Sequence, residues 1–247
     1  MSNDLTDLLG AAYATYPGKS VKPGVICVAV IPYVMDKCYV VRPYSPNPQS
    51  PEHRRYKLLE KTPAELALAG QDEWTLPFKD LNLDSNEDLL VVKVKRRPVV
   101  VLSRAIVDER KADPERIQDS FWCVPSYTLV DRFFHPQVNM TFIEDVEALT
   151  YRSFFPMPYD PHLHDRDAML RLDRMQPIPR HCLNPMEQRI TDEWLLYLTE
   201  WARFHITGQL GDEDSDNNPS SVASALKSAR ETLMEELTNK RAKQEAD

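Results

Sequence analysis

Residues 93–128, KVKRRPVVVLSRAIVDERKADPERIQDSFWCVPSYT, decide the fold expected for this 247-residue chain. They contain two apolar runs, residues 99–102 and residues 121–124, separated by a highly charged segment. Runs of this length, rich in β-branched and aromatic residues and bounded by polar clusters, predict strands buried in a barrel or sandwich. Pro98 cannot donate to a sheet hydrogen bond, so it marks the start of the first strand.

Polar side chains suited to binding phosphate lie at the ends of these two runs. Arg96 and Arg97 precede the first strand, while Ser126, Tyr127 and Thr128 follow the second. A guanidinium offers a fixed, bidentate positive charge that matches a phosphate group. If the two strands are neighbours, an arginine and a hydroxyl from their ends face one pocket.

Four segments, taken in order, resemble parts of the PemK/MazF family of toxins. Residues 96–103 read Arg-Arg-Pro, an apolar run and Leu-Ser, and residues 121–128 read an apolar run, Cys, Val-Pro, two residues and Thr. Residues 23–28 (PGVICV) resemble the family's opening Gly-led strand, and residues 166–175 (RDAMLRLDRM) resemble its later strand.

This resemblance implies an α+β, mainly β fold: an SH3-like, PemK/MazF-like barrel with an inserted segment and C-terminal helices. It also implies a metal-independent endoribonuclease that cleaves single-stranded RNA, needs no cofactor and forms a homodimer. An antitoxin or another protein is the expected partner. The N-terminus lacks the pattern of a signal peptide and no apolar run is long enough to span a membrane, so we expect a cytoplasmic protein.

RNA cleavage through the 2′-hydroxyl requires proton transfer and stabilisation of a negatively charged phosphorane. By the resemblance, Arg97 and Thr128 carry these catalytic roles. The substrate-binding residues are then expected to be Lys95, Arg96, Ser126 and Tyr127, with Ser126 as a reserve hydroxyl. The alternative is that Arg97 is a solvated rim residue and Thr128 a turn residue. The chain is then a non-catalytic barrel that binds a protein or nucleic acid in a toxin–antitoxin or defence-type assembly.

The net charge of −8 opposes nucleic-acid binding at long range. Residues 208–247 carry nine acidic and five basic side chains, which is −4 of this total. The rest of the chain is still acidic, so an RNA site has to be a local basic patch. The candidate patches are residues 54–57 and residues 93–97.

The domain organisation expected is a barrel domain over residues 1–207, with an insertion at about 42–89 and a C-terminal helix over 184–207. Residues 208–221 form an acidic linker, because they are polar and contain no aromatic residue. Residues 222–247 form an amphipathic helical tail. A helix detached in this way is expected to dock on a partner or a second copy of the chain, or else to be a partly disordered tail.

Local patterns predict the remaining elements. A short helix is expected over residues 4–16, and a strand over residues 25–31 with residues 37–41 as its hairpin partner. Residues 62–65 (TPAE) have the pattern of a helix start. Residues 141–151 are expected to form a short helix or a strand pair, residues 153–160 to be irregular, and residues 169–178 to form a strand.

A metal site is the remaining alternative. His162 and His164 lie two residues apart, a spacing that puts both imidazoles on one face of a strand, and aspartates flank them. No second cluster at ligand spacing accompanies them in the sequence, so a polar surface turn is the preferred interpretation and no metal is expected. The four cysteines are scattered and are expected to be reduced.

Overall fold

The computed structural model describes residues 5–32, 38–45, 49–51, 55–62, 65, 90–105, 119–129, 140–158, 160, 168–210 and 222–246. The chain divides into two compact units. The first comprises Met1–Ala29 and Arg96–Asp247, and the second comprises Val30–Lys95. The boundaries fall inside strands β2 (Val25–Pro32) and β6 (Val94–Arg104), and the predicted insertion at about 42–89 lies within the second unit.

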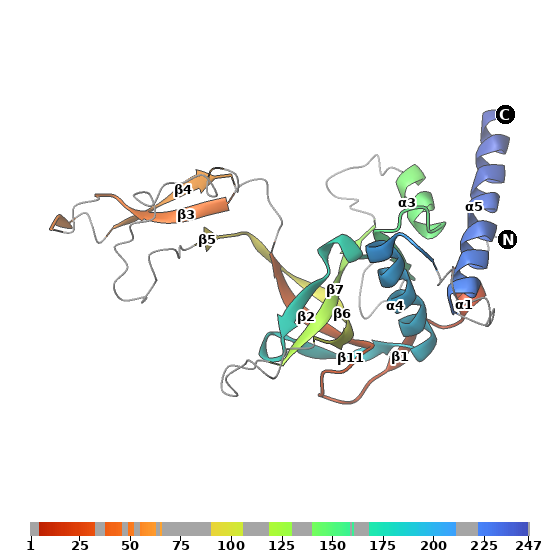
Figure 1. The fold of residues 1–247 in the computed structure, drawn as a ribbon, viewed down its shortest axis with the longest axis horizontal. Helices are drawn as coiled ribbons and strands as arrows, with labels where there is room; N and C mark the ends of the chain where they lie inside the picture. The colour runs from red at the N-terminus through yellow and green to blue at the C-terminus, as the bar shows by residue number, and fades with distance from the viewer. Residues whose placement is uncertain are drawn as a thin grey trace. The chain divides into compact units, whose positions relative to one another are not determined.

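The main sheet has eight strands in the order β1-β11-β2-β6-β7-β9-β8, with β10 also paired to β7 (Figure 1). Besides β2 and β6 it contains β1 (Tyr13–Thr15), β7 (Ser120–Thr128), β8 (Phe154–Met157), β9 (Ala168–Arg171), β10 (Gln176–Pro179) and β11 (Asn184–Ile190). The sheet is antiparallel, and the strands predicted at residues 25–31, 99–102 and 121–124 are confirmed. Among the described residues no pairing joins β1 to β8, so the sheet is open where a closed barrel was expected.

The strand predicted over residues 169–178 is divided in two. β9 pairs with Ser126–Thr128, and β10 pairs with Ser120–Cys123 further along the same edge of β7. A short 3-10 turn, η4 (Leu172–Arg174), connects them. Leu172 is buried there, so the turn places an apolar side chain in the core between two pairing segments.

The helix predicted over residues 184–207 begins only at residue 192. Asn184-Pro185 belongs to β11, which pairs with both β1 and β2, and its register with β2 shifts between Pro185 and Arg189. A proline is tolerated in a strand at such an irregularity. Helix α4 (Asp192–Thr207) is instead capped by Thr191, whose hydroxyl accepts from the Trp194 N–H, and it ends at Gly208 with φ of 77°.

The main core lies between the sheet and α4. Trp194, Leu198 and Trp201 recur at helical spacing on α4 and are almost fully buried. They pack with residues from one face of the strands: Ile26, Val100, Val124, Phe155, Leu170 and Ile190. The alternate residues of the central strands, among them Val25, Cys27, Val99, Val101 and Cys123, are also fully buried, so these strands are buried on both faces.

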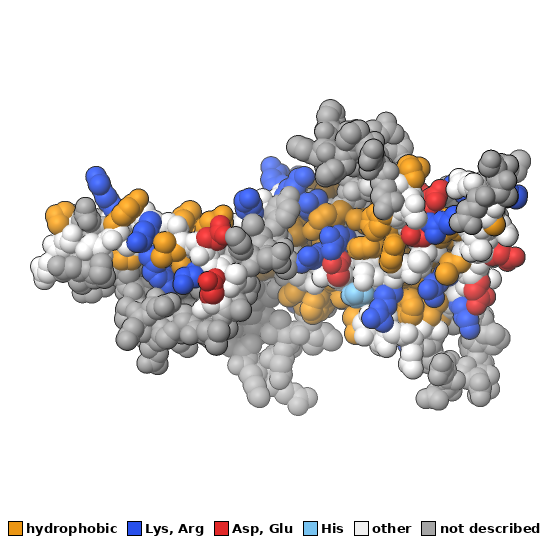
Figure 2. Space-filling model, turned by 90° about the horizontal axis from the view of Figure 1, so that it is seen from above, with side chains coloured by type: hydrophobic (Ala, Val, Ile, Leu, Met, Phe, Trp, Pro, Cys, Tyr) orange, Lys and Arg blue, Asp and Glu red, His pale blue; other side chains and the backbone are white. Residues whose placement is uncertain are grey.

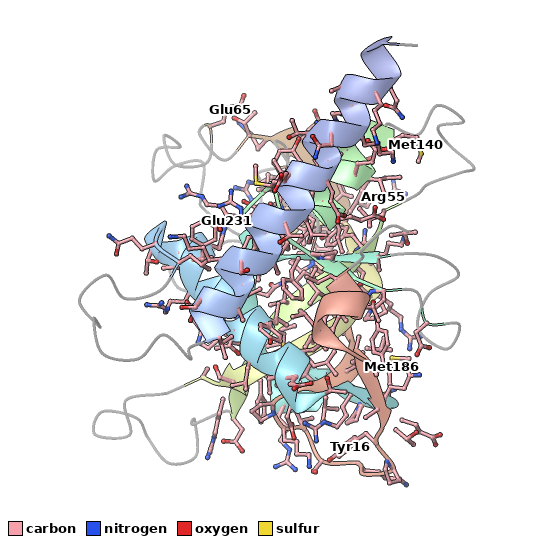
Figure 3. All side chains as sticks on the ribbon, turned by 90° about the vertical axis from the view of Figure 1, so that its right-hand side faces the viewer. Tyr16, Arg55, Glu65, Met140, Met186 and Glu231 are labelled. Carbon is pink, nitrogen blue, oxygen red and sulfur yellow. The ribbon has the colours of Figure 1, made fainter. Side chains whose placement is uncertain are left out.

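The C-terminal helix packs on its own chain. α5 (Val222–Ala246) buries Ala223, Leu226, Ala229 and Leu233, and Leu226 and Leu233 belong to the main core. It contacts α4 and α3 (Met140–Glu147), and Figure 3 looks onto it at the labelled Glu231. The expectation that this face docks on a partner or a second copy is therefore wrong. The apolar face of α5 packs against residues of the same chain.

Three other local predictions change. The N-terminal helix α1 (Leu5–Leu9) stops before Gly10, whose φ of 75° favours glycine, and residues 13–15 form β1 instead. Residues 140–147 form helix α3, which settles the open choice for 141–151 in favour of a helix. Residues 154–157, expected to be irregular, form β8, whose residues Phe155 to Met157 are buried.

The second unit contains a three-stranded sheet in the order β4-β3-β5. Its strands are β3 (Cys38–Pro43), β4 (Tyr56–Lys61) and β5 (Leu90–Val91). Within the described residues β3 pairs with β4 and β5, not with β2 as expected. The capping box is confirmed: the Thr62 N–H donates to the Glu65 carboxylate at 2.6 Å, and the Glu65 N–H donates to the Thr62 hydroxyl at 3.1 Å.

Candidate functional site

Arg97 stacks on Tyr127. β6 and β7 pair antiparallel with Val99 opposite Pro125, and the same register continued by two residues places Arg97 opposite Tyr127. The Arg97 Cζ lies 3.9 Å from the centroid of the Tyr127 ring. Both side chains are half-buried. The two predicted strands are thus neighbours, and an arginine from one meets an aromatic hydroxyl side chain from the other.

The Thr128 side chain lies on the opposite face of the sheet from Arg97. Tyr127 and Thr128 are consecutive residues of β7, and successive strand side chains point to opposite faces. Their partners on β9 agree: Tyr127 is opposite Met169 and packs with it, whereas Thr128 is opposite Ala168 of the main core. The hydroxyl that shares a face with Arg97 is therefore that of Tyr127, and the expected convergence of Arg97 with Thr128 does not occur in this register.

Further arginines gather around Tyr127. The Arg171 Cζ lies 5.2 Å from the Tyr127 ring centroid. Arg171 donates through Nε to Asp173 at 3.0 Å, and a second hydrogen bond joins the same two side chains. This hydrogen bonding raises the pKa of Arg171 although burial opposes it. Arg174 lies 3.5 Å from the same carboxylate. We call Arg97, Tyr127, Arg171, Asp173 and Arg174 the arginine cluster; it holds three cations and one anion.

An aromatic group adjoins the arginine cluster. The Arg171 Cζ lies 5.5 Å from the ring centroid of Phe154. The Phe154 ring packs edge-on against Phe142 at 5.6 Å and against Tyr151 at 5.8 Å between centroids. Sequence reasoning missed Arg171, Phe154 and Tyr151 as site residues, because no local spacing connects them to β6 and β7.

A small recess of about 10 Å³, enough for roughly one water molecule, lies on the other face of β6 and β7. Ser126, which is 4% exposed, lines it together with apolar residues, and none of these described lining residues is charged. Ser126 is therefore buried beside apolar residues, on the face of the sheet opposite Arg97. The lining residues are Tyr13, Ile26, Pro98, Val99, Val100, Ser126, Met157 and Leu170.

The other predicted site residues are more dispersed. Arg96 is exposed on β6 and precedes Arg97. Lys95 is also exposed, but it belongs to the second unit.

His162 and His164 lie outside the described residues. Within the described ranges no three His, Cys, Asp or Glu side chains come together as a metal site. Figure 2 shows Lys and Arg side chains interspersed with hydrophobic ones on one face of the molecule.

The buried cysteines are not placed for chemistry. Burial raises the pKa of the Cys27 and Cys123 thiols to about 12. A thiol that holds its proton at neutral pH is neither a nucleophile nor a metal ligand. Cys182 is exposed on η5 (Arg180–Cys182). These three cysteines are free thiols, as expected.

The fold defines this chain as an α+β protein with an open, eight-stranded antiparallel sheet covered by C-terminal helices. None of the helices in the described part of the chain has the length and apolar character needed to cross a lipid bilayer. Comparison with protein-family models, with curated proteins and with solved structures finds no match to this chain.

Proposed function

We propose that this chain is a non-catalytic module that binds single-stranded RNA through the arginine cluster. The observation that carries the proposal is the 3.9 Å stack of Arg97 on Tyr127. The stack involves the face of the guanidinium, and the planar guanidinium group matches the geometry of a phosphate. An arginine restrained in this way loses less conformational freedom when it binds a phosphate.

Charge supports an anionic ligand at this surface. The arginine cluster carries three positive charges against one negative charge, in a chain whose net charge is −8. Asp173 contacts both Arg171 and Arg174, while Arg97 lies on the Tyr127 ring. A local excess of cations on an acidic protein favours a ligand that is bound at short range, as phosphates are.

A catalytic role fits the geometry less well. Transesterification needs a base for the 2′-hydroxyl, and the hydroxyl on the face of Arg97 belongs to Tyr127. A hydroxyl can hold a phosphate, but it is a poor base unless another group activates it. Arg97 with Tyr127 therefore suits binding of the phosphate better than cleavage beside it.

One observation favours a second candidate, a metal-independent endoribonuclease of the PemK/MazF type. The four segments that resemble this family fall on β2, β6, β7 and β9, which are successive neighbours in one sheet. We propose an SH3-like arrangement of these four strands as the finer fold. In this candidate Arg97 stabilises the phosphorane. The protein then forms a homodimer and binds an antitoxin or another protein partner.

One experiment tests both candidates. A fluorescein-labelled single-stranded RNA and its 2′-O-methyl analogue, which cannot be cleaved through the 2′-oxygen, are titrated with wild-type protein and with Arg97→Ala. Binding is followed by anisotropy and RNA integrity on denaturing gels. Arg104→Ala is the matched control, because Arg104 is an exposed arginine on the same strand paired to Asp119.

The binding module predicts equal affinity for the two oligomers, loss of binding in Arg97→Ala and intact RNA. The nuclease predicts that wild-type protein cleaves the RNA, spares the analogue and loses activity in Arg97→Ala. If wild-type protein neither binds the oligomers nor cleaves the RNA, both candidates are wrong.

A further inference from the structure

A path of ring and guanidinium contacts leads from the arginine cluster to Tyr151. Tyr127 contacts Arg171, Arg171 contacts Phe154, and the Phe154 ring contacts Tyr151, with each separation under 6 Å. Phe154 lies on β8, and Tyr151 lies in the turn between α3 and that strand. Cationic and aromatic groups therefore follow one another along this surface.

Tyr151 differs from the other aromatic residues of this path in its exposure. Phe142, Phe154 and Tyr127 are half-buried and pack against the small cluster around Met169. Tyr151 is 39% exposed, the largest exposed fraction among these four aromatic residues. A packed aromatic residue that stays accessible to solvent can serve as a platform for stacking.

Contacts at both ends hold Tyr151 in place. Its ring packs against Phe142 and Phe154, with centroids 5.8 Å away in each case. Its hydroxyl donates to the Asp145 carboxylate at 3.2 Å, and Asp145 in turn accepts from Arg241 of α5 at 2.9 Å. A ring restrained before the ligand arrives loses little conformational entropy on binding.

We infer that Tyr151 stacks on an unpaired nucleobase of the RNA whose phosphates bind Arg97 and Arg171. The inference rests on the proposed function and adds the base-binding residue. Stacking on aromatic side chains is the general way in which proteins hold single-stranded nucleic acids, and it tolerates any sequence because every base has a π-face. The alternation of arginines with aromatic rings fits a polymer that alternates phosphates with bases.

The test removes the ring from the protein and the base from the RNA. Affinities of wild-type protein, Tyr151→Ala and Tyr151→Phe are measured by anisotropy, for 2′-O-methyl RNA and for versions carrying one abasic position scanned along the oligomer. We expect Tyr151→Ala to bind the intact oligomer about tenfold more weakly, and Tyr151→Phe to bind like wild type, since it keeps the ring. Leu196→Ala, at a hydrophobic residue of α4 that is 56% exposed, is the control and is expected to have no effect.

The abasic series does not depend on how the variant folds. Wild-type protein should lose about tenfold in affinity when one particular base is removed, and Tyr151→Ala should not distinguish that oligomer from the intact one. If binding depends on Arg97 but Tyr151→Ala and the abasic oligomers bind like their parents, the stacking role is wrong and the proposed function stands. If no oligomer binds wild-type protein, the proposed function and this inference both fall.

Discussion

At Arg97 the charge and the planar shape of the side chain contribute separately. A lysine at this position keeps the positive charge but cannot stack its head group on Tyr127 or present two parallel N–H donors. A cation–π contact is worth about 1 kcal/mol at a half-exposed site, and the second hydrogen bond adds a similar amount. We expect Arg97→Lys to bind RNA about tenfold more weakly than wild type.

The measurement is an anisotropy titration at constant salt. Arg104→Lys serves as the comparison, since Arg104 makes an exposed ion pair and no stack. Equal affinities for Arg97→Lys and wild type would show that only the charge matters, and that the Tyr127 stack has no role in binding.

The two buried thiols predict a pH dependence of stability. Burial raises the pKa of Cys27 and Cys123 to about 12, above an unfolded value of about 8.5. Because the folded state holds these protons more tightly, the stabilisation is complete below about pH 8.5. It is lost progressively as the pH rises toward 12.

Urea unfolding from pH 7.5 to 10.5 measures this loss. The Cys27→Ala/Cys123→Ala variant is expected to start less stable, because its core has cavities, but to lose less free energy of unfolding across this range. Parallel curves for the variant and wild type would contradict the assignment of the pH dependence to the thiols.

The sequence could identify Arg97 but not its partner. Pro98 and the apolar run after it define the strand, and the basic residue before the proline stands out. A shift of one residue in the pairing of β6 with β7 would change which hydroxyl faces Arg97, because successive side chains of a strand point to opposite faces of the sheet. Arg171 and Tyr151 were inaccessible to sequence reasoning, since only the pairing of β7, β9 and β8 brings them near Tyr127.

Among the helices, α5 is held mainly by apolar packing. Leu226 is fully buried in the main core, whereas Lys240 and Arg241 pair with Glu144 and Asp145 at the edge of α3. Large-to-small changes in a core cost about 2–5 kcal/mol, and exposed ion pairs contribute about 1 kcal/mol or less. We expect Leu226→Ala to lower the free energy of unfolding by about 2–5 kcal/mol.

Chemical denaturation of Leu226→Ala and Glu231→Ala checks this prediction. Glu231 is exposed on the same helix (Figure 3), so its substitution should change stability by no more than about 0.5 kcal/mol. A Leu226→Ala variant as stable as Glu231→Ala would mean that α5 is not part of the folded core.

The helices also show where local patterns mislead. Asn184-Pro185 has the composition of a helix start, but the chain continues as a strand until Thr191 provides the cap. The helix predicted over residues 222–247 is confirmed as α5. The sequence alone could not predict which surface α5 packs against, because residues of α3 and α4, which are distant in the sequence, form that surface.

At the scale of the whole molecule, an acidic chain is expected to bind RNA with a weak salt dependence. The net charge is −8, and within the described part of the chain the arginines around Tyr127 supply the cations of the proposed site. Two to three phosphate contacts to a single strand correspond to a slope of roughly −2 in a plot of log K against log salt.

Titrations between 50 and 300 mM salt give this slope. A slope of about −5 or steeper would require more phosphate contacts than the arginine cluster can make. Basic residues outside the arginine cluster would then have to contribute to RNA binding.

The most direct test compares Arg97→Ala with Thr128→Ala. These residues are on adjacent strands but on opposite faces of the sheet, so the two substitutions separate the proposed RNA surface from the other face. Affinity for a single-stranded 2′-O-methyl RNA is measured for both variants and for wild type. We predict that Arg97→Ala loses about tenfold or more and that Thr128→Ala binds like wild type. Equal losses in the two variants, or unchanged binding in Arg97→Ala, would contradict the account.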